Sequence, residues 1–126
     1  MSYDKIFRMN FSDVYALLAA KALKKGRTIA EVNEIICWLT GYSAEALEKS
    51  LTEPVSYGDF FKNAPQPNAN RALIRGTVCG VRVEEIEDPL MRKIRYLDKL
   101  VDELAKGKSI ETILKKAGAS SGNVLG

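Results

Sequence analysis

The apolar residues of this chain recur at spacings of three and four, between residues that typically start and stop helices. Thr28 and Glu31 form a capping box, in which each side chain bonds a free amide at the start of a helix. Gly41 closes that segment, because glycine readily takes the left-handed conformation of a helix end. Asp88 and Pro89 mark another start, with aspartate as the N-cap and proline at the first helical position. This pattern predicts an all-α fold.

Start signals of this kind divide the chain into an irregular array of about five to six helices. The start residues are Ser12, Thr28, Ser43, Ser56, Asp88 and Ser109. A chain of 126 residues suits one hydrophobic core, so we expect a single small helical domain over residues 1–116. The apolar repeat does not continue beyond it, and we expect residues 117–126 to form a flexible C-terminal tail.

The segment over residues 71–86 carries conflicting signals. Four of its residues are β-branched and favour a strand, namely Thr77, Val78, Val81 and Val83. However, no other segment alternates with a period of two, and a lone strand would leave its backbone groups without partners. We therefore predict a helix, in which Gly76 and Gly80 would let a neighbouring helix approach closely. The alternative is a short strand within residues 77–83, paired with its copy across a homodimer.

The candidates for a ligand site lie in and just before this segment, and they are Asn68, Asn70, Arg71, Arg75 and Arg82. In a helix, arginines spaced by four and seven residues share one face. The asparagines would then lie near its first turn, where free amides favour an anion. Guanidinium groups bind carboxylates and phosphates through paired hydrogen bonds, so a small anionic ligand is the predicted partner. The alternative is that the arginines pair with neighbouring carboxylates and the asparagines only cap and turn.

The chain contains no histidine, and this narrows the chemistry that it can perform. Histidine is the usual general base near neutral pH and the commonest metal ligand, so Ser-His-Asp and Cys-His catalysis and most zinc sites are excluded. We expect no metal ion and no cofactor. Cys79 lies between Arg75 and Arg82, whose charges would lower its pKa, so a small enzyme or thiol-based redox sensor is the alternative function. The plainer interpretation of Cys79 is a buried apolar side chain, and a binding or interaction protein is favoured over an enzyme.

Charge and hydropathy narrow the partners further. The net charge of +3 is too small to indicate nucleic acid, and Glu45 and Glu48 occupy the helix that would have to read DNA. No apolar run approaches the roughly 18 residues of a membrane span, and the charged N-terminus does not form a signal peptide, so we expect a cytoplasmic protein. The apolar stripe over Leu90–Leu104 suits a dimer seam, but packing within one bundle explains so short a repeat better. The sequence remains compatible with a homodimer, a small anionic ligand and a protein partner.

Four stretches carry a resemblance to a known family, and they are Gly26–Thr28, Trp38–Ser43, Val78–Leu90 and Ile94–Leu100. Together and in this order they resemble the bacterial family known as Domain of Unknown Function 2200, over about Lys5 to Lys115. The resemblance implies a small, mostly helical bacterial protein with irregularly arranged helices. The family has no established activity, so the resemblance assigns no functional residue.

The thiol hypothesis makes a prediction of its own. A reactive Cys79 would be alkylated in the folded protein at a lower pH than an ordinary thiol, because the thiolate is the nucleophile. The measurement is the rate of alkylation of the folded protein across a pH series. Protection of Cys79 until the protein is denatured would eliminate the hypothesis.

Overall fold

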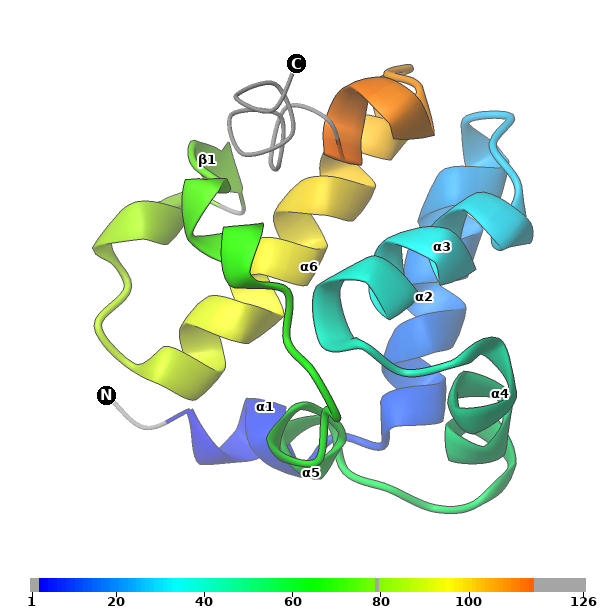
Figure 1. The fold of residues 1–126 in the computed structure, drawn as a ribbon, viewed down its shortest axis with the longest axis vertical. Helices are drawn as coiled ribbons and strands as arrows, with labels where there is room; N and C mark the ends of the chain where they lie inside the picture. Colours follow the sequence, from blue (N-terminus) through cyan, green and yellow to red (C-terminus); the bar gives the residue numbers. More distant parts are fainter. Residues whose placement is uncertain (1–2, 79, 115–126) are drawn as a thin grey trace.

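A computed structural model describes residues 3–78 and 80–114 of the chain (Figure 1). Its helices are α1 (Asp4–Arg8), α2 (Phe11–Lys24), α3 (Ile29–Thr40), α4 (Ala44–Thr52), α5 (Tyr57–Lys62) and α6 (Pro89–Ala105). Between α5 and α6 lie two 3-10 helices, η1 (Ala69–Leu73) and η2 (Val83–Glu85), and the strands β1 (Thr77–Val78) and β2 (Val81–Arg82). Residues 110–114 form a further short helix after α6. This small helical domain with one short pair of strands confirms the predicted fold class.

Helix starts agree with the sequence wherever a side chain caps the first turn. The Thr28 hydroxyl accepts a hydrogen bond from the Glu31 amide at 3.2 Å, and the Thr28 amide donates to the Glu31 carboxylate at 2.9 Å. Asp88 accepts from the Met91 amide at 2.9 Å and caps α6. These contacts satisfy amides that the first turn of a helix leaves free. By contrast, α1 and α2 have no side-chain cap. The sequence pattern did not predict α1, and α2 begins at Phe11 rather than after the predicted start residue Ser12.

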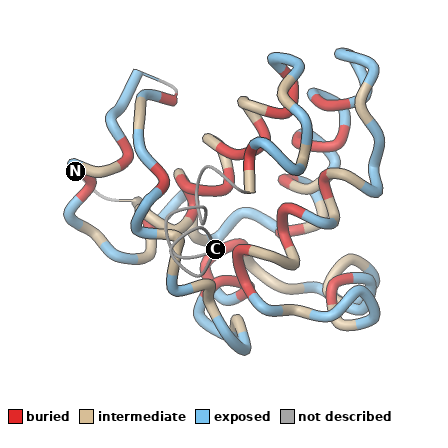
Figure 2. The backbone as a smooth tube through the Cα atoms, turned by 45° about the horizontal axis from the view of Figure 1, so that its top comes forward, coloured by how far each residue is buried: buried red, intermediate tan, exposed pale blue. Residues whose placement is uncertain are grey.

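The central element is α6, which packs against α2, α3, α5, β1 and η2. Its buried residues are Met91, Ile94, Tyr96, Leu97, Leu100, Val101, Leu104 and Ala105. Buried segments of several elements face the interior of the molecule in the tube view (Figure 2). The apolar stripe over Leu90–Leu104 is therefore used for packing inside the chain, as expected for a single bundle.

An aromatic cluster joins the start of α2 to α5. The rings of Phe11 and Phe60 stack with their centroids 3.7 Å apart. The ring of Tyr42 also stacks on Phe60, with a distance of 4.5 Å between the centroids. The Tyr42 hydroxyl donates to the Phe60 carbonyl at 2.6 Å, so its polar end is satisfied within the core. The aromatic residues near these helix ends thus belong to the core.

The helix predicted over residues 71–86 is wrong. The strands β1 and β2 form an antiparallel hairpin, with Thr77 opposite Arg82 and Val78 opposite Val81. Gly80 has a φ of 78°, which favours a hairpin turn and is incompatible with a right-handed helix. The β-branched residues find their partners a few positions along the same chain, so no second copy is needed to satisfy the backbone. The sequence does contain a pattern typical of a hairpin, because two β-branched residues, Val78 and Val81, flank a pair of residues that ends in Gly80.

The end of α3 makes an unusually close contact with the segment before η1. The Gln66 amide donates to the Thr40 carbonyl at 3.1 Å, and the Asn68 amide donates to the Leu39 carbonyl at 3.0 Å. Gly41 has a φ of 82°, and a Cβ atom at this position would lie 2.6 Å from the Gln66 carbonyl oxygen. Both the backbone conformation and the space therefore require glycine here.

We expect Gly41→Ala to lower the free energy of unfolding by about 2–5 kcal/mol, since the left-handed conformation costs about 1–2 kcal/mol and overpacking about 1–3 kcal/mol. Gly26→Ala is the matched control, because Gly26 has a φ of 79° but nothing lies within 4 Å of its added Cβ. The control should lose only the conformational part, about 1–2 kcal/mol. Urea denaturation of both variants measures the difference, and equal losses would contradict the close contact.

Candidate functional site

A cavity of about 420 Å³ lies between α6, the segment around the hairpin and the residues that follow α6. Its charged lining residues are Arg75, Arg82, Glu84, Lys99, Glu103 and Lys108. Its apolar lining residues are Leu73, Ile74, Leu100 and Ile113, and Gly76 completes the wall. This volume lies within the range of about 300–1,000 Å³ that is usual for small-molecule sites.

The cavity carries an excess of positive charge, because four of its side chains are cationic and two are carboxylates. Glu103 binds Lys108 at 2.6 Å and lies 3.8 Å from Lys99, so it is the counterion of both lysines. Burial raises the pKa of Glu103, but the hydrogen bond from Lys108 and the charges of the nearby lysines outweigh burial and hold the pKa below its ordinary value. Glu103 is therefore ionised at neutral pH.

Glu84 is held from the side of the hairpin. Its Oε1 accepts a hydrogen bond from the Gly76 amide at 3.0 Å, and its Oε2 lies 3.4 Å from Nε of Arg82. The hydrogen bond from Gly76 is the main reason why the pKa of Glu84 lies below its ordinary value. Both carboxylates of the cavity are thus ionised and already satisfied by neighbours.

Lys99 reaches across the cavity floor from α6 to the hairpin. Its ammonium group donates to the Thr77 carbonyl at 3.2 Å, and its side chain is only 13% exposed. A Cβ atom on Gly76 would lie 3.0 Å from Cε of Lys99, so the lysine stem passes directly over this glycine. The absence of a side chain at Gly76 therefore makes room for a mostly buried cation, rather than for the neighbouring helix backbone that we expected.

Arg75 differs from the other three cations. Within residues 3–78 and 80–114, its guanidinium group takes part in no ion pair or hydrogen bond, and the residue is exposed. Arg82 makes one ion pair through Nε, which leaves its two terminal nitrogens without a partner among the same residues. Two guanidinium groups with unused donors therefore line one cavity.

The structure separates the five residues that the sequence suggested as a ligand site. Arg75 and Arg82 line the cavity, whereas Asn68, Asn70 and Arg71 do not. The Asn68 side chain accepts from the Asn70 amide at 2.8 Å and caps η1, and Nη1 of Arg71 donates to the Asn68 carbonyl at 2.8 Å. The shared helix face that was expected for the three arginines does not exist, because the segment is not helical. Cys79 lies outside the described residues.

Sequence reasoning did not connect Lys99, Glu103, Lys108 and Ile113 with this site. Along the chain, Lys99 and Glu103 read as an ordinary pair spaced by four on a solvated helix face. Only the packing of the hairpin beside α6 brings them to Arg75 and Arg82, and no sequence motif reports this packing.

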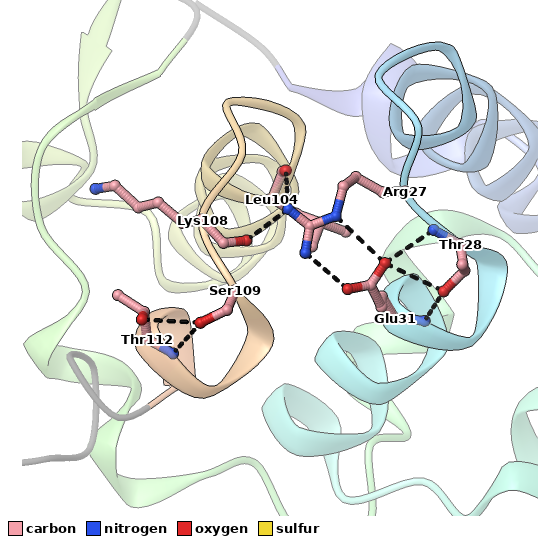
Figure 3. Close-up of polar contacts among 7 residues, drawn as sticks. All are labelled: Arg27, Thr28, Glu31, Leu104, Lys108, Ser109 and Thr112. Atoms are coloured by element: carbon pink, nitrogen blue, oxygen red, sulfur yellow. Dashed lines mark hydrogen bonds and ion pairs between the residues drawn. The ribbon is translucent and has the colours of Figure 1, made fainter.

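Arg27 anchors the wall of the cavity that follows α6 (Figure 3). Its Nη2 binds Glu31 at 2.7 Å, while its Nη1 donates to the carbonyls of Leu104 at 3.2 Å and Lys108 at 2.8 Å. The guanidinium group thereby caps the last carbonyls of α6, where cations suit the helix dipole. Ser109 then caps the helix over residues 110–114 by accepting from the Thr112 amide at 3.1 Å. The turn before α3 thus positions the backbone of Lys108.

Two properties of the described residues concern metal binding and membrane spanning. Among the described residues, no group of three or more histidine, cysteine, aspartate or glutamate side chains could hold a metal ion. None of the helices in this part of the chain is long and apolar enough to cross a membrane.

Fold and site together define a small helical protein with a cavity rich in cationic side chains. A family model described as an uncharacterized protein conserved in bacteria, Domain of Unknown Function 2200, matches residues 5–115, and the chain belongs to this family. The chain is also similar to the crystal structure of the uncharacterized protein SP1917, with 48% identity and a TM-score of 0.88. That similarity covers 93% of this chain and 95% of the other. No curated protein matches.

The contact between Arg27 and Glu31 predicts a strong pKa shift. The hydrogen bond from Arg27 is the main cause that lowers the pKa of Glu31 from 4.5 to about 2. The folded-state pKa is depressed, so this pair stabilises the protein above pH 4.5 and loses its contribution as the pH falls towards 2. In Arg27→Gln, we expect the pKa of Glu31 to rise towards its ordinary value. An NMR titration of the Glu31 side-chain carboxyl carbon measures it.

Arg8→Gln is the control, because Arg8 only forms an exposed pair with Asp4 at 3.9 Å. This variant should leave the pKa of Glu31 unchanged. A Glu31 that titrates near 4.5 in the unmodified protein would contradict the contact in Figure 3.

Proposed function

We propose that this protein is a cytoplasmic binding protein and that its ligand is a small anion held in the cavity beside α6. The observation that carries this proposal is the excess of positive charge in a 420 Å³ cavity, where Arg75 has no partner among the described residues. A guanidinium group offers paired donors that fit a carboxylate or a phosphate. The anion would supply the counter-charge that the cavity itself does not provide.

The positions of the charges support an anion at the hairpin side of the cavity. On the lysine side, both cations already have a carboxylate partner, because Glu103 accepts from Lys108 and lies near Lys99. On the other side, Arg82 shares Glu84 with the Gly76 amide, and Arg75 has no carboxylate partner in the described part of the chain. The proposed anion therefore contacts Arg75 and the terminal nitrogens of Arg82. This site keeps two of the five residues suggested by the sequence and adds α6 as its opposite wall.

A homodimer stays a prediction. The apolar face of α6 is used inside the chain, so self-association would need another surface. The binding proposal does not depend on it, because the cavity is lined by residues of one chain.

Inorganic phosphate and pyrophosphate are the probes that test the proposal. Binding to the folded state alone should raise the melting temperature with increasing probe concentration. Arg75→Gln should weaken the affinity by about tenfold or more, because a charge-assisted hydrogen bond contributes about 1.5–3 kcal/mol. Isothermal titration calorimetry gives the dissociation constants, and thermal unfolding gives the stabilisation.

Arg71→Gln is the matched control. It removes a guanidinium group from the same region, but Arg71 binds the Asn68 carbonyl and does not line the cavity. Its dissociation constants should equal those of the unmodified protein. If neither probe binds, or if both variants lose the same affinity, the anion site is wrong.

A further inference from the structure

The apolar lining residues of the cavity narrow the class of ligand that it suits. Three of its lining residues are core residues whose side chains keep a small exposed area, with Ile74 and Ile113 at 4% and Leu100 at 3%. The fourth, Leu73, is 40% exposed. Because Leu73 is accessible and lines the cavity, an apolar group of a bound ligand would cover it.

Each wall of the cavity carries both charged and aliphatic side chains. Leu73 and Ile74 directly precede Arg75 in the segment before the hairpin, and Leu100 lies next to Lys99 on α6. Figure 1 shows the hairpin beside α6 and the helix over residues 110–114, which carries Ile113, at the C-terminal end of α6. A ligand that fills the cavity would therefore contact both cations and aliphatic side chains.

We propose that the ligand is an amphiphile, with an anionic head group at Arg75 and Arg82 and a short aliphatic chain against Leu73, Leu100 and Ile113. This inference rests on the proposed function, which concerns the anionic head alone. A volume of 420 Å³ corresponds to roughly 14 water molecules at about 30 Å³ each. The cavity thus suits a ligand of about a dozen non-hydrogen atoms, which is a phosphate or carboxylate head with a chain of a few carbons.

The ionised carboxylates set the orientation of this ligand. Glu103 lies on α6 near Leu100 and keeps its negative charge, because Lys108 and Lys99 hold it. An anionic head group placed there would be repelled by the carboxylate, whereas a neutral aliphatic chain would not be. Glu84 already pairs with Nε of Arg82, but Arg75 has no carboxylate partner among the described residues. The head group therefore lies towards Arg75.

A series of n-alkyl phosphates below their micelle concentrations tests the aliphatic chain, with inorganic phosphate, ethyl, butyl and hexyl phosphate as the members. The head group is constant, so any gain in affinity comes from the chain. Each fully buried methylene tightens binding by about fourfold, and we expect a gain of about tenfold or more from ethyl to hexyl phosphate. Calorimetry of the full chain measures the dissociation constants.

Leu73→Ser should reduce the ratio of ethyl to hexyl dissociation constants, because it replaces an apolar wall by a polar side chain. Leu17→Ser is the matched control, since Leu17 is 65% exposed on α2 and does not line the cavity. It should leave every dissociation constant unchanged. Arg75→Gln should weaken all members of the series and keep the ratio, which separates the head group from the chain.

The outcomes distinguish this inference from the proposed function. If phosphate binds but hexyl phosphate binds no more tightly than ethyl phosphate, the amphiphile is wrong and the anion site stands. If the gain from chain length is the same in Leu73→Ser as in the unmodified protein, the chain does not lie in this cavity and the inference is overturned. If no member of the series binds, both proposals fail.

Discussion

Burial of the apolar face of α6 is the constraint on which the rest of this structure depends. Helices α2, α3 and α5, together with β1 and η2, all pack on this one helix, which carries eight buried residues. The flank of α6 that faces the cavity presents Lys99 and Glu103, one helical turn apart. Helix α6 therefore forms one wall of the cavity and also carries the buried residues of the core. Because both sets of residues lie on one helix, the helix fixes the positions of Lys99 and Glu103 relative to the core.

Helix boundaries were predictable where the information is local. The capping box at Thr28 and the aspartate-proline start at Asp88 involve side chains that bond amides three residues away, and both occur as expected. The hairpin was missed although its turn signal is equally local. The spacing of Gly76 and Gly80 favours close helix packing, and the lack of a second alternating segment disfavours a sheet. The strand's partner was the next few residues of the chain.

The candidate site was only partly predictable, for a different physical reason. The sequence identifies Arg75 and Arg82 as candidates because guanidinium groups bind anions, but Asn68 and Arg71 from the same set bond the local backbone. Lys99 and Lys108 become members of the site through contacts between segments that are distant in sequence. Residue type and spacing describe a helix face well, but they do not say which other element covers it.

The contact made by Arg27 has a consequence for how this chain can vary. Its bonds to α6 and the following turn end on main-chain oxygens, at Leu104 and Lys108. Leu104 is fixed by its buried side chain, but the carbonyl of Lys108 is present whatever side chain occupies that position, so a substitution at Lys108 leaves the anchor intact. For these bonds, only position 27 requires a particular side chain. Three nitrogens of the planar Arg27 guanidinium group donate hydrogen bonds at once, and the single ammonium group of a lysine cannot replace them. The cavity wall at Lys108 can therefore change its side chain while its backbone stays in place.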